Sequence, residues 1–345
     1  MARVAITTVI TVMGRAETHR QDRYSPHRCA LAPLLPLAPE SALSESCRYA
    51  ANTGEEAFTT FLSEQGLAPL WGEYVAESNG ELPLSQEAES ALHQNRISAT
   101  GHYLLQHHNL QLAGEILNAV KIPHAIIKGA HTRELYYDVP ALRPAVDIDI
   151  LVKPEDKLEA IRSFQVQGFT FYGPAHNISH ECNLVKGNTA IDLHWDILRP
   201  GRTREPMINE LLSSRVDYGG HWGLGHGETL FLMLVHPVFT KYTTTPHASL
   251  VRLVDLAQLL HRHPESMERA VTLLQKAGLA AAGWITCSWL YLLTGNPEAN
   301  ALAARLEPGT LRRKYLQNWL VNNLSTRLLS SPLLIQLGFT LPAHD

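Results

Sequence analysis

The sequence predicts an α+β protein in which a small mixed sheet lies between two helical parts. Two observations predict this fold: period-2 alternation is confined to the middle of the chain, and helical apolar spacing flanks it on both sides. Hydrophobic residues make up 45% of the 345 residues, which is ample material for a core. We expect a poorly ordered leader over 1–50, a helical lead-in over 51–121, an α/β core over 122–223 and a helical domain over 224–345.

The first part of the chain is predicted to become ordered only near residue 50. Scattered Arg, His, Pro and Ser over residues 14–48 show no regular period. From Glu55 the apolar residues follow helical spacing until Asn79-Gly80 interrupts it. A long helix is then expected from Ser85 to Val120.

The middle of the chain alternates strands with one helix. Lys186-Gly187-Asn188 is typical of a hairpin turn, and the glycine-rich run 219–227 is expected to be a turn into the C-terminal helices. We predict strands at 123–128, 146–152, 169–173, 178–186 and 189–196, a helix at 155–167, and C-terminal helices at 230–239, 250–260, 270–277 and 280–293.

Two aspartates two residues apart are the most informative feature of the predicted core. Asp147 and Asp149 alternate with Val146, Ile148 and Ile150. A strand would therefore place both carboxylates opposite the apolar side chains, roughly 6.5–7 Å apart. Asp is depleted in strands, and two carboxylates held on one face suit Mg²⁺ ions bound to nucleotide phosphates. The alternative is an acidic strand face exposed to solvent.

A second strand repeats this alternation. Ile191 and Leu193 alternate with Asp192 and His194, which makes Asp192 a candidate third carboxylate facing the first two. We expect Asp192 to complete a metal site and to help deprotonate an attacking hydroxyl. His194 shares the carboxylate face, where it would orient Asp192 or contact substrate. The alternative for His194 is a histidine satisfied by a hydrogen bond in a half-buried sheet.

A strand, a glycine turn and a helix start together predict a phosphate-binding turn. Gly129 follows the first predicted strand, and free N–H groups at a helix start point at an anion. Lys128 would add a point charge, and Arg143 would bind phosphate bidentately. The alternatives are a solvent-facing strand end for Lys128 and, for Arg143, an ion pair with Glu134 or Asp138.

Histidines and a cysteine in the middle of the chain raise the question of a zinc site. His176, His180, Cys182 and His194 are chemically suitable ligands. Strand alternation would put His180 and Cys182 on one face and leave His176 outside the strand. Because this spacing matches no zinc motif, we do not expect structural zinc.

The ordered set of motifs resembles a known superfamily. Lys128-Gly129, Arg143, Asp147-Ile-Asp149 and Asp192-Leu-His194-Trp195 look like the nucleotidyltransferase superfamily of the DNA polymerase β type. More narrowly, the chain resembles the bacterial family described as uncharacterised nucleotidyltransferase. The resemblance runs from about Glu55 through the segment 230–260, and it implies the small nucleotidyltransferase sheet with its carboxylates on neighbouring strands.

The resemblance also implies an activity. The implied reaction transfers a nucleoside monophosphate from an NTP to a hydroxyl or phosphate acceptor. It would depend on Mg²⁺, with Mn²⁺ as a substitute. The acceptor would be a small molecule, or a peptide or protein of a biosynthetic pathway, and less readily a tRNA. A non-catalytic nucleotide-binding module and a phosphotransferase moving the γ-phosphate are the alternatives. The implied metal ligands are Asp147, Asp149 and Asp192, and the implied nucleotide-binding residues are Lys128, Gly129, Arg143 and His194.

The phosphate turn departs from the superfamily pattern. The superfamily usually has a second Gly or a Ser directly after the first glycine, whereas Ala130 and His131 follow Gly129 here. We expect Lys128 to compensate with its charge. The altered turn favours the non-catalytic alternative, while the three carboxylates favour catalysis.

Composition limits the partners and the compartment. The net charge of −4 argues against a large basic surface for nucleic acid. Four scattered cysteines without a Cys-x-x-Cys pair fit a reducing cytoplasm. No segment offers the ~20 apolar residues of a membrane span, so no membrane partner is expected.

Overall fold

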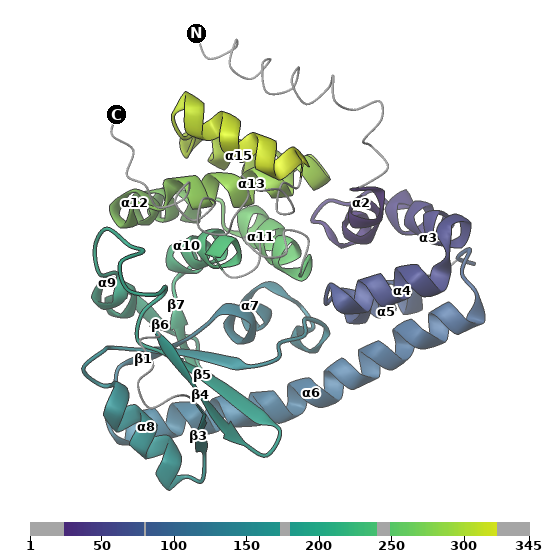
Figure 1. The fold of residues 1–345 in the computed structure, drawn as a ribbon. Helices are drawn as coiled ribbons and strands as arrows, with labels where there is room; N and C mark the ends of the chain where they lie inside the picture. The colour runs from purple at the N-terminus through teal and green to yellow at the C-terminus, as the bar shows by residue number, and fades with distance from the viewer. Residues whose placement is uncertain (1–23, 79–80, 173–179, 240–248, 323–345) are drawn as a thin grey trace.

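A seven-stranded mixed sheet forms the middle of the computed structural model, which describes residues 24–78, 81–172, 180–239 and 249–322 (Figure 1). The strand order is β3-β4-β5-β2-β1-β7-β6, in which the pairs β2/β5 and β1/β7 are parallel and the others antiparallel. The strands are β1 His124–Ile127, β2 Ile148–Val152, β3 Thr170–Tyr172, β4 Glu181–Lys186, β5 Thr189–His194, β6 Arg215–Asp217 and β7 Trp222–Leu224.

Helices precede, interrupt and follow the sheet. No helix in the described part of the chain combines the length and apolar character needed to cross a bilayer. The helices are α2 Ser25–Leu31, η3 Ala32–Leu34, α3 Ser41–Thr53, α4 Glu55–Glu64, α5 Ala68–Glu77, α6 Gln86–Ala119, α7 Lys128–Tyr136, η4 Pro140–Leu142, α8 Lys157–Val166, α9 Ile208–Ser213, α10 His226–Pro237, α11 Val251–Arg262, α12 Ser266–Ala277, α13 Ala280–Thr294, α14 Pro297–Arg305 and α15 Thr310–Asn322.

The two faces of the sheet pack against different layers. On β2, Ile148 and Ile150 join the cluster formed with α6 and α8, which includes Leu117 and Phe164. The alternate residue Leu151 belongs to the larger core that contains the C-terminal helices. Period-2 alternation therefore holds here although both faces are buried. As a consequence, Asp149 faces the side of the C-terminal helices.

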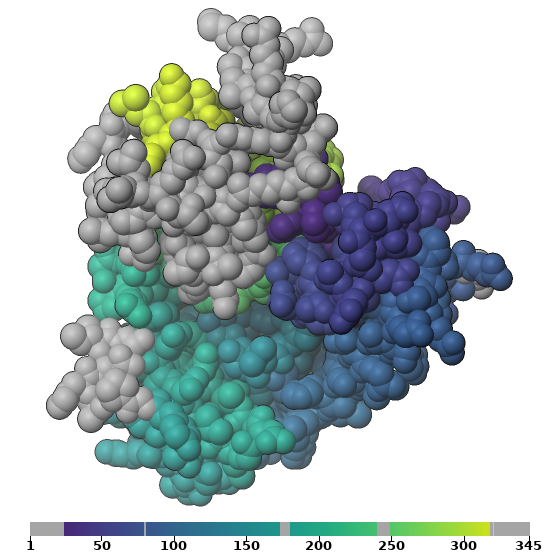
Figure 2. Space-filling view, turned by 45° about the vertical axis from the view of Figure 1, so that its right-hand side comes forward, coloured from purple at the N-terminus to yellow at the C-terminus, as the bar shows by residue number. Residues whose placement is uncertain are grey.

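The long helix α6 begins and ends where the sequence predicts. The Ser85 hydroxyl caps its first turn by accepting a hydrogen bond from the Ala88 N–H at 3.3 Å. Its C-terminal half packs beneath the sheet, and Figure 2 shows its first half adjoining the N-terminal helices, drawn in purple and dark blue. The helix thus joins the lead-in to the α/β core.

The N-terminal expectation is wrong for the residues that the structure describes before residue 50. Helices α2, η3 and α3 form between Ser25 and Thr53, and Leu31 and Cys47 are fully buried in the main core. The Trp71 indole N–H donates to the Ala30 carbonyl at 2.9 Å. Packing against other helices, which a local pattern does not reveal, orders this segment. Residues 1–23 lie outside the described part.

A strand forms within each of the five predicted ranges, and a helix overlaps each predicted C-terminal range. Residues 173 and 178–179 of those ranges lie outside the described part of the chain, and two features differ from the prediction. Residue Val146 lies before β2 and is 89% exposed, so it belongs to neither core. The glycine-rich run 219–227 contains β7, which pairs with β6 as a hairpin at the sheet edge and also with β1. These two strands have three residues each, which is too short for alternation to be recognised.

A buried histidine fastens α7 to strand β7. His131 is fully buried, and its Nε2 lies 3.0 Å from the Leu224 carbonyl while its Nδ1 lies 2.9 Å from His221 Nε2. The imidazole fills the space above Gly223: a Cβ built there would lie 2.2 Å from His131 Cε1. Residue 223 must therefore be glycine, because the His131 imidazole packs directly against its Cα.

Replacing Gly223 by Ala should lower the free energy of unfolding by about 1–3 kcal/mol, because the added methyl displaces an imidazole held by hydrogen bonds. Urea denaturation followed by circular dichroism measures this. Gly220→Ala is the matched control, since a Cβ there meets nothing within 4 Å, and it should change stability by less than about 0.5 kcal/mol. Equal stability of the two variants would contradict the assigned packing.

Candidate active site

The junction of β1 and α7 forms the centre of the candidate site. Ile127 is the last residue of β1 and precedes the first turn of α7, and no side chain caps that turn. Lys128 takes a left-handed conformation with φ of +54°, a conformation that a non-glycine residue adopts at some energetic cost. Residues of the first helical turn line the cavity described below, where a helix start can bind an anion through its free N–H groups.

Strands β2 and β5 bring two of the predicted carboxylates together. Their parallel register places Asp149 directly beside Asp192. Asp147 lies just before β2, at the same edge of the sheet. Asp149 is 4% exposed, and the three carboxylates are close enough to influence one another's ionisation, as their pKa values show.

Asp149 is buried as an anion with two partners. The Lys128 ammonium lies 2.6 Å from Asp149 Oδ1, and His194 Nε2 lies 2.8 Å from the same oxygen. Burial alone would raise the pKa of Asp149, but the Lys128 charge and the His194 hydrogen bond lower it to about 2. Lys128, expected at the phosphates, thus neutralises a carboxylate in this structure.

The other two carboxylates are shifted the opposite way. Burial, followed by repulsion from Asp149 and Asp192, raises the pKa of Asp147 to about 6. Burial, followed by repulsion from Asp149, also raises the pKa of Asp192. A divalent cation would relieve this crowding of negative charge. Oxygen donors from neighbouring strands fit the preference of Mg²⁺ for carboxylates, and Asp149, Asp192 and His194 have donor atoms within 4.8 Å of one another.

His194 differs from its expected role. It is 1% exposed, and it contacts Asp149 rather than Asp192. Its Nδ1 lies 3.0 Å from Glu181 Oε2 across the β4–β5 pair. The amide of Asn183 donates instead to Asp192. The reading of His194 as a hydrogen-bonded histidine of the sheet matches the structure.

Arg143 pairs with neither of the two predicted acids. Its Nε donates to Asp255 Oδ1 at 3.1 Å and its Nη2 to Asp255 Oδ2 at 2.5 Å, while its Nη1 donates to the Pro144 carbonyl at 2.8 Å. The Tyr137 hydroxyl donates to Asp255 Oδ1 at 2.7 Å. This buried pair joins the loop before β2 to helix α11. A Cβ at Gly129 would lie 2.4 Å from Arg143 Nη1, so the glycine is required by this guanidinium.

A cavity of about 690 Å³ contains these groups, a volume within the roughly 300–1,000 Å³ usual for ligand pockets. One wall carries the carboxylates and the start of α7. The other wall comes from the end of α4 and from α10 and α11. The cavity is lined by Lys128, Gly129, Arg143, Asp147, Asp149, Glu181 and Asp192 on the first wall and by Ser63, Glu64, Leu232, Met233, His236, Val251 and Arg252 on the second.

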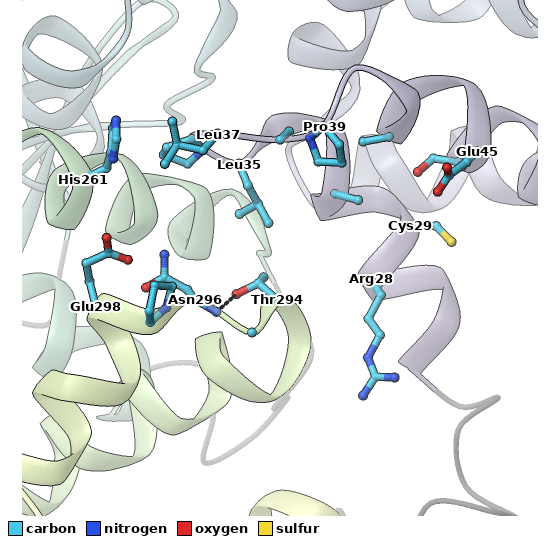
Figure 3. A pocket seen from close by; sticks show the side chains of 17 residues that line it. Arg28, Cys29, Leu35, Leu37, Pro39, Glu45, His261, Thr294, Asn296 and Glu298 are labelled. Carbon is cyan, nitrogen blue, oxygen red and sulfur yellow. Dashed lines mark hydrogen bonds between the residues drawn. The ribbon is translucent and has the colours of Figure 1, made fainter. Parts of the chain in front are cut away.

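A second cavity, of about 510 Å³, lies between the N-terminal helices and α11, α13 and α14 (Figure 3). Leu35 and Leu37 line it on one side and Thr294 and Asn296 on the other, where the Asn296 N–H donates to the Thr294 hydroxyl at 3.2 Å. The first cavity is the candidate active site because the strongly shifted carboxylates converge there.

Sequence reasoning missed Glu181 and the partner of Arg143. Glu181 was recoverable, since counting outward from the hairpin turn at Lys186-Gly187-Asn188 places it opposite His194. The Arg143–Asp255 pair spans 112 positions, and no local signal connects the two residues.

Replacing Asp255 by Asn should lower the free energy of unfolding by roughly 3–5 kcal/mol, because it leaves the Arg143 guanidinium buried without its counter-charge. Thermal and urea denaturation of the full chain measure the change.

Glu268→Gln is the control for charge removal as such. Glu268 pairs with Arg305 at the surface, with 79% of its side chain exposed, and its loss should cost less than about 1 kcal/mol. A similar small effect for Asp255→Asn would mean that the buried pair is not a structural tie.

Comparison with protein families agrees with this geometry. The family model described as uncharacterised nucleotidyltransferase matches residues 51–293, which includes α4 to α12, all of α13 but its last residue, and every strand of the sheet. No functionally curated protein matched the chain. The match covers well over half of the sequence, and the chain therefore belongs to the uncharacterised nucleotidyltransferase family.

Proposed function

We propose that this chain transfers a nucleoside monophosphate from an NTP to an acceptor oxygen, with release of pyrophosphate. The observation that carries the proposal is the convergence of Asp147, Asp149 and Asp192 beside the start of α7 in one cavity. Carboxylates beside a phosphate-binding helix start are what catalysis by positioning and charge neutralisation requires. Membership of the nucleotidyltransferase family supports the reaction class.

The three aspartates would hold Mg²⁺, or Mn²⁺ in its place, which when bound neutralises phosphate charge and polarises the reacting phosphorus. The N–H groups of Gly129 and the residues after it would receive the phosphates. Asp192 would accept the proton of the attacking hydroxyl, since it lies beside Asp149 in the parallel register of β2 and β5 and lines the cavity. The acceptor oxygen attacks the α-phosphorus, and the bond to the bridging oxygen of the leaving pyrophosphate breaks.

The second wall of the cavity would bind the acceptor. Leu232, Met233 and Val251 give it an apolar surface, and Glu64, His236 and Arg252 give it polar groups. This mixture suits a small molecule or a peptide side chain. An RNA acceptor is disfavoured by the net charge of −4, because RNA binding depends on many phosphate contacts with Lys and Arg.

A non-catalytic nucleotide-binding protein is the second candidate. The specific observation in its favour is the ion pair of Lys128 with Asp149 at 2.6 Å, which removes charge from a carboxylate that the reaction would use. A phosphotransferase that moves the γ-phosphate is a third possibility, and its products differ: a nucleoside diphosphate in place of pyrophosphate.

The double substitution Asp147→Asn with Asp149→Asn should lower turnover by about 100-fold or more, since it removes two charges that stabilise the transition state. The purified chain is incubated with each α-³²P-labelled NTP, Mg²⁺ and a host-cell extract. Label in an acceptor fraction with wild type alone, together with pyrophosphate release, is the expected result.

An exposed aspartate outside the cavity provides the control variant. Asp138→Asn removes a carboxylate whose side chain is 87% exposed, and it should leave turnover unchanged. Activity retained by the double variant would refute the carboxylate assignment. Transfer from γ-labelled but not α-labelled NTP would replace nucleotidyl transfer by phosphoryl transfer, and nucleotide binding without transfer of either label would favour the non-catalytic candidate.

A further inference from the structure

Three side chains of the β4–β5 hairpin gather nitrogen and oxygen donors beside the carboxylates. Glu181 and His194 are opposite each other in the antiparallel register, and His180 directly precedes β4. Glu181 Oε2 lies 3.0 Å from His194 Nδ1 and 3.4 Å from His180 Nε2. All three donor atoms lie within 4.8 Å of one another.

We propose that His180, Glu181 and His194 bind a zinc ion at a site separate from the three aspartates. Zn²⁺ forms bonds of about 2.0–2.1 Å to nitrogen and carboxylate oxygen, so two tetrahedral ligands lie about 3.3–3.4 Å apart. The distances from Glu181 are close to this value. Two imidazoles with one carboxylate favour zinc over Mg²⁺, which prefers oxygen ligands alone.

The outer nitrogen of His194 already has the partner that a zinc-bound histidine needs. His194 Nε2 lies 2.8 Å from Asp149 Oδ1. Metal-binding histidines usually donate their second N–H to a carboxylate, which fixes the tautomer and turns the free lone pair toward the metal. One imidazole would thus connect the zinc site to the proposed nucleotide site.

The His180 imidazole is buried beside His194 with one of its nitrogens unpaired among the described residues. It is 9% exposed, and its Nδ1 finds no hydrogen-bond partner among the described residues. Its Nε2 faces Glu181. The contact from His180 Nε2 to Glu181 is long for a hydrogen bond, and a metal ion shared by the two side chains would replace it with two direct bonds.

From the sequence, His176, His180, Cys182 and His194 are suitable zinc ligands but no zinc site is expected, and His176 lies outside the described residues. Cys182 points into the cluster formed with α6 and α8, on the opposite face of β4 from Glu181, so it cannot complete this site. Glu181 takes its place as the third donor. Because Glu181 lines the large cavity, the fourth position of a tetrahedral zinc would be accessible to water or a ligand.

The competing reading needs no metal. A protonated His194 would bridge Asp149 and Glu181 through its two nitrogens, which lie 2.8 and 3.0 Å from the respective carboxylate oxygens. This reading predicts no zinc binding by the purified chain, and His180 would then only pack beside Glu181 and His194. A measurement of the zinc bound by the purified chain therefore distinguishes the two readings.

The full chain is stripped with a chelator, dialysed against Zn²⁺ in excess Mg²⁺, and analysed for bound metal. We expect one zinc ion per chain, and a visible absorption band of tetrahedral geometry when Co²⁺ replaces it. His180→Ala and Glu181→Gln should each weaken zinc binding by about 100-fold or more. Glu181→Gln guards against misfolding, because 38% of its side chain is exposed and the amide preserves its shape.

Two control variants separate this site from other possibilities. Asp147→Asn disables the proposed nucleotide site without touching the zinc donors, so it should retain the zinc. The double variant His226→Ala with His263→Ala removes another close histidine pair, whose rings stack at 3.6 Å, and it should retain the zinc as well. No zinc bound by wild type, zinc retained in full by His180→Ala, or zinc lost from the histidine-pair variant would each overturn the proposal.

Discussion

The burial of Asp149 as an anion is the constraint on which the site depends. An ionised carboxylate that is 4% exposed would cost several kcal/mol, or would take up a proton, without compensation. Lys128 and His194 supply that compensation through charge-assisted contacts to one oxygen. Lys128 directly follows β1 and His194 ends β5, and β2, which carries Asp149, lies between those two strands in the sheet. The strand order of the sheet is thus what brings both partners to the Asp149 carboxylate.

A second buried charge connects the sheet to the helices that complete the cavity. Arg143 precedes β2, and Asp255 belongs to α11, which contributes to the second wall. The guanidinium also touches Gly129, where a Cβ would lie 2.4 Å from Arg143 Nη1. Any shift of α11 relative to the sheet would therefore disturb both the ion pair and the turn at Gly129. Such coupling explains why an arginine in a loop is buried and fully paired.

The local spacing of apolar residues along the sequence determined which elements could be predicted. Alternation correctly placed Ile148 and Ile150 opposite Asp149, and Ile191 and Leu193 opposite Asp192, because both strands pack an apolar face on α6 and α8. It failed for β6 and β7, which have three residues each. Helices α2 and α3 escaped prediction for a different reason, since their order comes from packing against distant helices. Of the site, the carboxylates were predictable from spacing, whereas the pairing of Arg143 with Asp255 is a property of the tertiary structure.

The altered phosphate turn has a structural cause that bears on its chemistry. Ala130 is buried in the cluster beneath the sheet, and His131 is committed to Leu224 and His221. Neither side chain is available to a ligand, so any phosphate contact at this turn falls to backbone N–H groups. Lys128 belongs to that turn, and its ammonium is held by Asp149. A cation bound by the aspartates would compete for that carboxylate, and Lys128 would then be released toward the phosphates that arrive with it. The departure from the superfamily pattern is therefore compatible with catalysis, provided that metal and nucleotide bind together.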